Sequence, residues 1–223
     1  MTSEYNTKSA FREAPAGEHG GDCYRNSVDC DFSINLNPLG MPKEVGEAVK
    51  NGAEGWERYP DPLCQQLTEA IAEKFQLRPE MILCGNGAAD LIFQAVLAER
   101  PKKALVLSPS FSEYEQALRA FDCQVLSFPL KEEEGFVPDV DRMTEFIADA
   151  SGKKVDMVFF CNPNNPSGIA VEREQGEKLA AFCLKNRVRL ILDECFCQFL
   201  EKPRRVTMTG RAERYPNLMI LRA

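Results

Sequence analysis

One stretch of this chain constrains its fold more than any other. An apolar run at residues 155–160 leads into a turn at residues 161–168 with the sequence CNPNNPSG. A second apolar run, at residues 188–192, leads into Asp193 and Glu194. Residues 172–185, between the two runs, have helical spacing with apolar side chains on one face and charges on the other. The sequence therefore predicts a strand–helix–strand unit.

Such a unit places its polar ends together. Two strands joined by a helical crossover run parallel, so the asparagine turn and the paired acids are expected at the same carboxyl edge of a sheet. Ligands of open α/β sheets bind outside that edge. An amide donor beside a carboxylate suits a heteroaromatic ligand that carries an acceptor oxygen and a basic ring nitrogen.

The rest of the chain repeats the alternation of strands and helices, which predicts an α/β fold with a mostly parallel sheet and helices on both faces, a three-layer αβα arrangement. The charged segment 131–135 is expected to be a solvated loop, and residues 1–42 to be an N-terminal arm rich in Gly, Pro, Asn and Asp. Helices are predicted after Pro42 and at residues 62–75, 88–99, 113–121 and 139–149, and strands at 81–84, 104–107, 124–128 and 219–223.

Composition excludes some partners and bounds the compartment. A net charge of -7 argues against a nucleic-acid surface or an anionic membrane as partner. No apolar run is long enough to span a membrane, and the polar first 22 residues do not resemble a secretory signal. The nine cysteines are scattered without paired metal-ligand spacing, so we expect reduced, structural thiols in a cytoplasmic protein without a bound metal.

Seven short segments occur in an order that is typical of one enzyme family. Through them, the chain from His19 to Ala223 resembles the pyridoxal-phosphate enzymes of aminotransferase class I/II, or fold type I. Within the family it is most similar to the branch that contains threonine-phosphate decarboxylase and histidinol-phosphate aminotransferase. The segments are HGGD at 19–22, DFSINLNPLG at 31–40, RYPDP at 58–62, GNG at 85–87, PSF at 109–111, the asparagine turn and the acidic strand end.

The resemblance implies an incomplete enzyme. Residues 43–223 would form the N-terminal part of the large domain that binds pyridoxal 5'-phosphate, and residues 1–42 an arm contributing to the substrate pocket and the small domain. Family members continue into a segment with the lysine that forms the Schiff base, and then into a C-terminal domain; neither is expected within this chain.

Two residues of the strand–helix–strand unit are the main cofactor candidates. The resemblance implies that Asp193 keeps the pyridine nitrogen of the cofactor protonated, so that the ring accepts the electrons of a broken bond. From position alone, Asp193 is equally well explained as an acid that caps the next element. Asn165, by resemblance, donates to the phenolic oxygen of the cofactor, although asparagine–proline turns are common. Phe196 stands where many relatives have a tyrosine that binds the same oxygen, and Glu194 is expected to be structural.

Four further positions are carried over from the family. Gly87 and Ala88 open a predicted helix, where backbone amides favour an anion such as the cofactor phosphate; a tight packing turn is the alternative. Phe111 matches the aromatic residue that stacks on the pyridine ring, with a core phenylalanine as the alternative. Tyr59 matches a residue that reaches the cofactor phosphate of the neighbouring subunit, which implies a homodimer.

The arm supplies the candidates for substrate binding. His19, the only histidine, and Asn35 resemble substrate contacts of threonine-phosphate decarboxylases, where the histidine touches the substrate phosphate. A solvated histidine is the alternative. The expected function is that of an enzyme acting on a small phosphorylated amino acid, threonine-phosphate decarboxylase-like. The alternatives are an aminotransferase of histidinol-phosphate type and a non-catalytic half-domain that binds cofactor or a partner.

Overall fold

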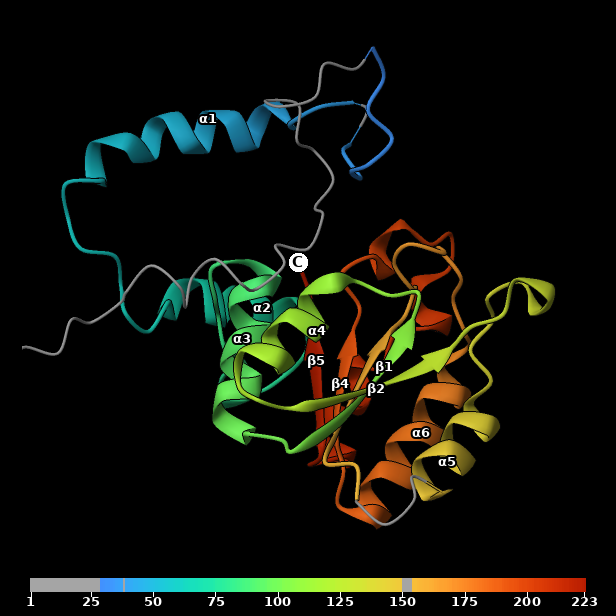
Figure 1. Ribbon diagram of the computed structural model, residues 1–223. Coiled ribbons are helices and arrows are strands. Elements are labelled where there is room, and N and C mark those ends of the chain that lie inside the picture. Colours follow the sequence, from blue (N-terminus) through green and yellow to red (C-terminus); the bar gives the residue numbers. More distant parts are fainter. Residues whose placement is uncertain (1–28, 38, 150–153) are drawn as a thin grey trace, which may run out of the picture. The chain divides into compact units, whose positions relative to one another are not determined.

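The computed structural model describes residues 29–37, 39–149 and 154–223 (Figure 1). Contacts divide the chain into two compact units, residues 1–62 and residues 63–223. The predicted division at residue 42 lies within the first unit, 20 residues before this boundary (62 − 42).

The second unit contains the sheet. Its five strands are ordered β2-β1-β3-β4-β5, and every neighbouring pair is parallel. The strands are β1 (Lys103–Ser108), β2 (Gln124–Pro129), β3 (Met157–Cys161), β4 (Arg189–Asp193) and β5 (Leu218–Leu221). The helices are α2 (Gln65–Phe75), α3 (Gly87–Glu99), α4 (Ser112–Ala120), α5 (Val140–Asp149) and α6 (Arg173–Asn186).

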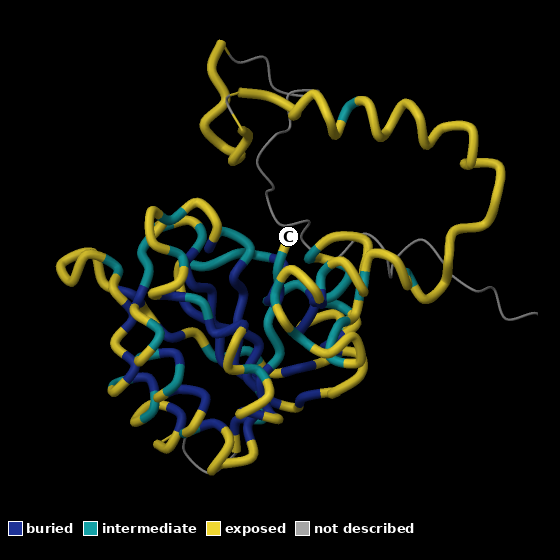
Figure 2. The backbone as a smooth tube through the Cα atoms, turned by 180° about the vertical axis from the view of Figure 1, so that it is seen from behind, coloured by how far each residue is buried: buried dark blue, intermediate teal, exposed yellow. Residues whose placement is uncertain are grey.

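Side chains that alternate along the strands fill two separate cores. On β3, Val158 and Phe160 belong to a core completed by α5 and α6, whereas Met157 and Phe159 belong to a core completed by α3 and α4. This is the period of two expected for a strand buried on both faces. Figure 1 shows the two helix pairs on opposite faces of the sheet, and Figure 2 shows the buried residues in the interior of this unit. The predicted three-layer α/β fold is thus confirmed.

One predicted strand is wrong. Residues 81–84 were expected to form a strand, but the structure has a short 3₁₀ helix, Pro79–Met81, followed by extended residues outside the sheet. The backbone of Ile82 is extended, with φ −114° and ψ 128°. An apolar run becomes a strand only where a neighbouring strand accepts its hydrogen bonds, and the two edges of this sheet are formed by β2 and β5. The other predicted strands and helices agree with the structure to within a few residues.

The first unit has a different character. Its helix α1 (Lys43–Gly52) contains no buried residue, and a 3₁₀ turn, Ala53–Gly55, follows directly. Large apolar and aromatic side chains are exposed along the described part of this unit, among them Phe32, Trp56 and Tyr59. Within itself, this unit offers little apolar burial to hold its conformation.

The described residues contain no candidate for a membrane-spanning helix, a metal-ligand group or a disulfide. Among the described residues, no helix combines the length and the apolar character that crossing a bilayer requires. The same part of the chain has no group of three or more His, Cys, Asp or Glu placed to hold a metal ion. Its eight cysteines, Cys30 to Cys197, are all free thiols.

The two-sided core leads to a stability prediction. Leu190 on β4 has no exposed surface, so Leu190→Ala should lower the free energy of unfolding by about 2–5 kcal/mol through lost burial and a residual cavity. Leu97 on α3 is 45 % exposed, so Leu97→Ala is a matched control that should change it by less than about 1 kcal/mol. Urea unfolding followed by circular dichroism measures both. Equal losses from the two variants would contradict the burial assigned to β4.

Candidate functional site

The parallel register brings the carboxyl ends of three strands together. On β3 and β4, Cys161 pairs with Asp193, and Asp193 in turn pairs with Leu221 at the end of β5. The backbone N–H of Asn162 donates to the carbonyl of Asp193 at 2.8 Å, so the asparagine turn starts directly beside the acid. The predicted juxtaposition of the turn and the acids is therefore present.

Asp193 is a buried carboxylate held by neutral donors. It is 4 % exposed and accepts hydrogen bonds from the Tyr114 hydroxyl at 2.6 Å and from the Cys195 backbone N–H at 2.9 Å. A carboxylate has about four lone-pair sites, so two remain for a further donor. In the described part of the chain, no lysine or arginine forms an ion pair with Asp193. Its negative charge is thus available to a cationic or donating group of a ligand.

Tyr114 connects this acid to the predicted stacking residue. Its ring stacks on Phe159 with centroids 4.8 Å apart, and Phe111 packs edge-on against it at 5.6 Å. Burial in the first place, together with the neighbouring Cys161 and Asp193, raises the pKa of Tyr114 well above its ordinary value. The hydroxyl therefore stays protonated and serves as a donor to Asp193. Phe111 itself is half-buried at the N-cap of α4, directly after β1.

The three asparagines of the turn have different surroundings. The side chain of Asn162 exchanges two hydrogen bonds with the backbone of Val171, at 2.9 and 3.0 Å. Asn164 is bonded to Pro109, Ser110 and Ser167. Asn165 is half-buried, and its side chain has no hydrogen bond to any other residue that the structure describes. Asn165 is thus the member of the turn whose amide is left for a ligand, and its predicted bond to a cofactor stays a prediction.

The predicted anion-binding turn requires its glycines for two reasons. Gly87 has φ +83°, a conformation that L side chains rarely adopt. A Cβ on Gly85 would lie 2.6 Å from Cδ2 of Leu91, so a larger residue would displace that side chain. The Asp90 carboxylate accepts the Asn86 backbone N–H at 2.8 Å and thereby fixes the turn. First-turn N–H groups of α3, such as that of Ala88, lack a partner within the helix and remain suited to an anion.

Three predicted site residues belong to the first unit. Tyr59 is 100 % exposed and Asn35 is also exposed, both in the first unit. His19 lies outside the described residues. The roles assigned to these three residues in phosphate and substrate binding stay predictions.

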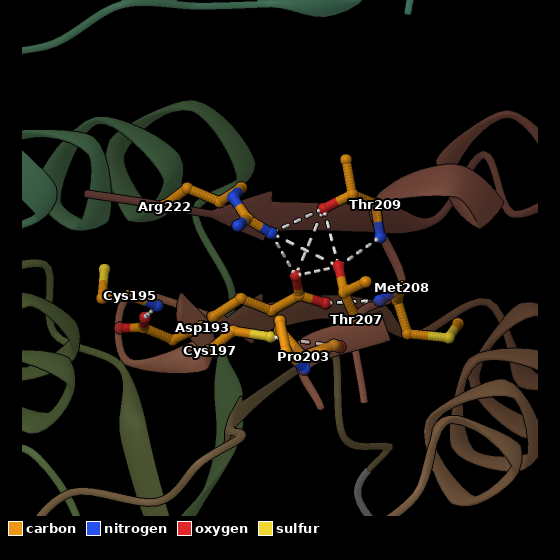
Figure 3. Close-up of polar contacts among 9 residues, drawn as sticks. Asp193, Cys195, Cys197, Pro203, Thr207, Met208, Thr209 and Arg222 are labelled. Carbon is orange, nitrogen blue, oxygen red and sulfur yellow. Dashed lines mark hydrogen bonds and ion pairs between the residues drawn. The ribbon is translucent and has the colours of Figure 1, made fainter. Parts of the chain in front are cut away.

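Glu194, next to Asp193, occupies a separate polar cluster on the other side of the strand end (Figure 3). It is 1 % exposed and accepts from the Thr207 hydroxyl at 2.5 Å and the Met208 N–H at 2.5 Å. Arg222 pairs with it at 2.7 Å and lies over the ring of Phe75 on α2, 4.7 Å from the centroid. The cluster joins the ends of β4 and β5 to the segment around Thr207, which supports the expected structural role of Glu194.

The thiols near the site are not poised as nucleophiles. Burial raises the pKa of the Cys161 thiol to about 12, and the nearby Asp193 carboxylate acts in the same direction. Burial likewise raises the pKa of Cys195. Because the thiolate is the reactive form, both cysteines are inert small side chains at neutral pH, as the sequence predicted.

A hollow of about 520 Å³ lies at the opposite edge of the sheet, at the amino ends of the strands. It is lined by the helix-end residues Arg100 and Arg187 and by Lys102 and Asp156. Cations at helix C-termini balance the negative ends of the helix dipoles, which explains their presence there. This hollow is far from the convergent polar groups described above, and we do not assign the site to it.

Sequence reasoning missed Tyr114, Asn164 and Arg222. Tyr114 occupies a buried helix position, and such a position predicts only core packing. The pairing of Arg222 with Glu194 joins residues 28 apart (222 − 194), which no local pattern reveals. A usable signal for Tyr114 did exist, because it follows Phe111 by three residues and so lies on the same face of α4.

Comparison with known proteins agrees with the fold and identifies the family. Residues 28–223 match the family model described as aminotransferase class I and II. Threonine-phosphate decarboxylase of Salmonella typhimurium is 34 % identical over 193 residues, which cover 86 % of this chain and 51 % of the relative. Histidinol-phosphate aminotransferase 1 of Mannheimia succiniciproducens is 32 % identical over 195 residues, covering 86 % and 51 %.

Solved structures give the same result. The histidinol-phosphate aminotransferase of Clostridium acetobutylicum superposes with a TM-score of 0.74 at 29 % identity, over 86 % of this chain and 54 % of that one. The fold and the polar groups at its carboxyl edge thus define an α/β protein with a cofactor-type site. The chain belongs to the class I and II aminotransferase family, and it spans about half the length of the curated relatives named above.

The buried ion pair leads to a second prediction. Arg222→Met should lower the free energy of unfolding by about 3–5 kcal/mol at pH 7, because it leaves the Glu194 charge buried and unpaired. Arg222→Lys keeps a cation and should recover part of the loss. Arg205→Met is the control, since Arg205 and Glu172 form an exposed pair that contributes at most about 1 kcal/mol.

The pH dependence of this loss has a definite sign. Burial raises the pKa of Glu194 in the wild type, while its donors and Arg222 oppose the shift. Removing Arg222 raises that pKa further, so the folded variant takes up a proton that the unfolded chain, at the ordinary glutamate pKa, does not hold. The stability deficit should therefore grow as pH rises above the ordinary glutamate value and shrink toward acid. Urea midpoints measured across this range test it, and a deficit that is constant with pH would contradict it.

Proposed function

We propose that this chain forms the cofactor-binding part of a pyridoxal-phosphate-dependent enzyme that acts on a small phosphorylated amino acid, in the manner of threonine-phosphate decarboxylase. The observation that carries the proposal is Asp193, a buried carboxylate with two neutral donors and spare acceptor capacity. A buried charge without a counter-ion is costly, so a site that keeps one is built to receive a cationic or donating group.

The residues present fit the cofactor. Asp193 would receive the ring nitrogen, Phe111 would cover the ring face, and the unbonded Asn165 amide would donate to the phenolic oxygen. The turn at Gly87 and Ala88 would hold the phosphate through backbone N–H groups. When bound, pyridoxal 5'-phosphate supplies an electron-withdrawing ring that stabilises the charge left when a bond to the substrate α-carbon breaks.

The site is compatible with two activities, decarboxylation of threonine phosphate and amino transfer from histidinol phosphate. Two threonine-phosphate decarboxylases, one of them described as putative, are 34–35 % identical to this chain, and two histidinol-phosphate aminotransferases are 32 % identical. Phe196 supports the decarboxylase, because threonine-phosphate decarboxylases resemble this chain in lacking the tyrosine that many relatives have at this position. An aminotransferase of histidinol-phosphate type is the second candidate, and a non-catalytic half-domain that binds cofactor or a partner is the third.

The first unit supports a homodimer with a shared site. Tyr59 is fully exposed, as a residue that reaches a neighbouring subunit would be in a single chain. Phe32 and Trp56 in the same unit also expose large side chains, which favours burial against another surface. We propose a cytoplasmic dimer whose partners are otherwise small molecules.

Replacing Asp193 tests the role of the acid. Asp193→Asn keeps the size of the side chain but removes the charge that stabilises a protonated ring nitrogen. In the holoenzyme we expect turnover to fall by on the order of a hundredfold or more. Asp122→Asn is the matched control, since Asp122 is exposed in the turn between α4 and β2 and should leave turnover within twofold. An Asp193→Asn enzyme within threefold of the wild type would show that the acid only holds the strand end.

Replacing His19 distinguishes the two activities. If the arm histidine holds a substrate phosphate, His19→Ala removes a charge-assisted hydrogen bond and should raise KM for threonine phosphate by about tenfold or more. The KM for unphosphorylated amino acids and the cofactor absorbance should not change. Carbon dioxide release from threonine phosphate is compared with amino transfer from histidinol phosphate to 2-oxoglutarate. Dominant transfer, with KM unchanged for both phosphorylated substrates, would reject the decarboxylase and the role of His19.

A further inference from the structure

Two buried asparagines of the turn after β3 have different partners. Asn162 and Asn164 are each 2 % exposed, and the side-chain amide of each both donates and accepts hydrogen bonds. The side chain of Asn162 bonds only to Val171, so it closes the loop of residues 162–171 upon itself. Asn164 reaches out of this loop to the segment that follows β1. One asparagine thus stabilises its own loop, and the other connects that loop to the neighbouring one.

Asn164 connects the two loops with both ends of its amide. Its Oδ1 accepts from the Ser110 hydroxyl at 3.2 Å, and its Nδ2 donates to the Pro109 carbonyl at 3.2 Å. The second Nδ2 hydrogen goes to the Ser167 hydroxyl at 3.0 Å, within its own loop. The backbone of Asn164 is fixed as well, because its N–H donates to Ile169 and its carbonyl accepts from Gly168. The amide is therefore a rigid bridge and not a freely rotating side chain.

The residues on either side of this bridge are the two that the proposed function places on the ring of the cofactor. Ser110 directly precedes Phe111, whose ring would cover the ring face. Asn164 directly precedes Asn165, whose amide would meet the phenolic oxygen. One buried amide thus links the loops after β1 and β3 next to both of these residues.

We propose that Asn164 is a positioning residue that fixes Phe111 and Asn165 relative to each other, and thereby sets the slot for a planar ring carrying an oxygen substituent. The inference rests on the proposed function for the identity of the ligand. The link between the loops, however, is a property of this chain alone. The Phe111 ring also packs against Tyr114, and the Tyr114 hydroxyl donates to Asp193. Asn164 therefore links Asn165 to an aromatic ring that is already held next to Asp193.

The chain offers a matched pair of variants for the test. Ser110→Ala removes one of the two hydrogen bonds that cross between the loops, whereas Ser167→Ala removes only bonds that stay within a loop. Both serines are half-buried, and each substitution deletes one hydroxyl. Asn164→Ala removes the whole bridge and completes the series.

Two readouts are measured on each variant. Hydrogen exchange followed by mass spectrometry reports the amides of residues 110–113 without any ligand. Isothermal titration with pyridoxine 5'-phosphate reports the slot, because this probe has the ring, the oxygen and the phosphate but no aldehyde and hence needs no lysine. Thermal unfolding of each variant shows how much of any change comes from general destabilisation.

We expect Ser110→Ala to weaken binding of the probe by about five- to tenfold, the loss of one hydrogen bond, and to raise exchange at residues 110–113 several-fold. Asn164→Ala should do at least as much, and Ser167→Ala should stay within about twofold on both readouts. Equal effects of the two serine variants, or unchanged exchange in Asn164→Ala, would overturn the inference. If the wild type does not bind the probe, the proposed function fails, and the exchange comparison alone decides whether Asn164 couples the loops.

Discussion

The parallel pairing of β3 with β4 is the constraint on which the site depends. Residues Met157 to Cys161 pair one-to-one with Arg189 to Asp193, so both strands end at the same level. The Asn162 N–H continues the ladder by donating to the Asp193 carbonyl. A shift of one residue in this register would turn Asp193 toward the other core and away from Tyr114. The turn amide and the acid lie together because backbone hydrogen bonds fix them there.

The alternation of side chains along β4 also separates two neighbouring acids. Ile191 belongs to the core of α3 and α4, and Asp193 follows it with the same parity and meets Tyr114 of that core. Leu192 belongs to the opposite core, and Glu194 follows it and meets Met208 there. One acid receives a cation, Arg222, and the other receives only neutral donors. The strand period thus divides one acidic pair into a structural charge and an available one.

The same period explains how far sequence reasoning reaches. The apolar runs around β1, β3 and β4 fixed the sheet, the polar strand ends indicated the edge for the site, and Asp193 followed from the two together. The run at 81–84 was misread because an apolar tetrapeptide carries no information on whether a pairing strand exists. Tyr114 and Asn164 were missed because their hydrogen bonds join residues 79 and 54 or 55 apart in sequence. Contacts at such separations arise from packing and leave no local pattern.

The division of the chain into two units assigns different parts of the chemistry to each. All the groups proposed to touch the cofactor ring, Phe111, Asn165 and Asp193, are tied into the second unit by its sheet and its cores. The residues proposed to touch a substrate or a neighbouring subunit, Asn35 and Tyr59, belong to a unit whose helix α1 buries nothing. A ring slot held by buried hydrogen bonds is preorganised before any ligand arrives, whereas contacts from an unburied segment form only when another surface covers it. Contacts to the cofactor ring should therefore depend on the sheet unit, whereas substrate choice and the phosphate contact proposed for Tyr59 should depend on the segment that precedes it.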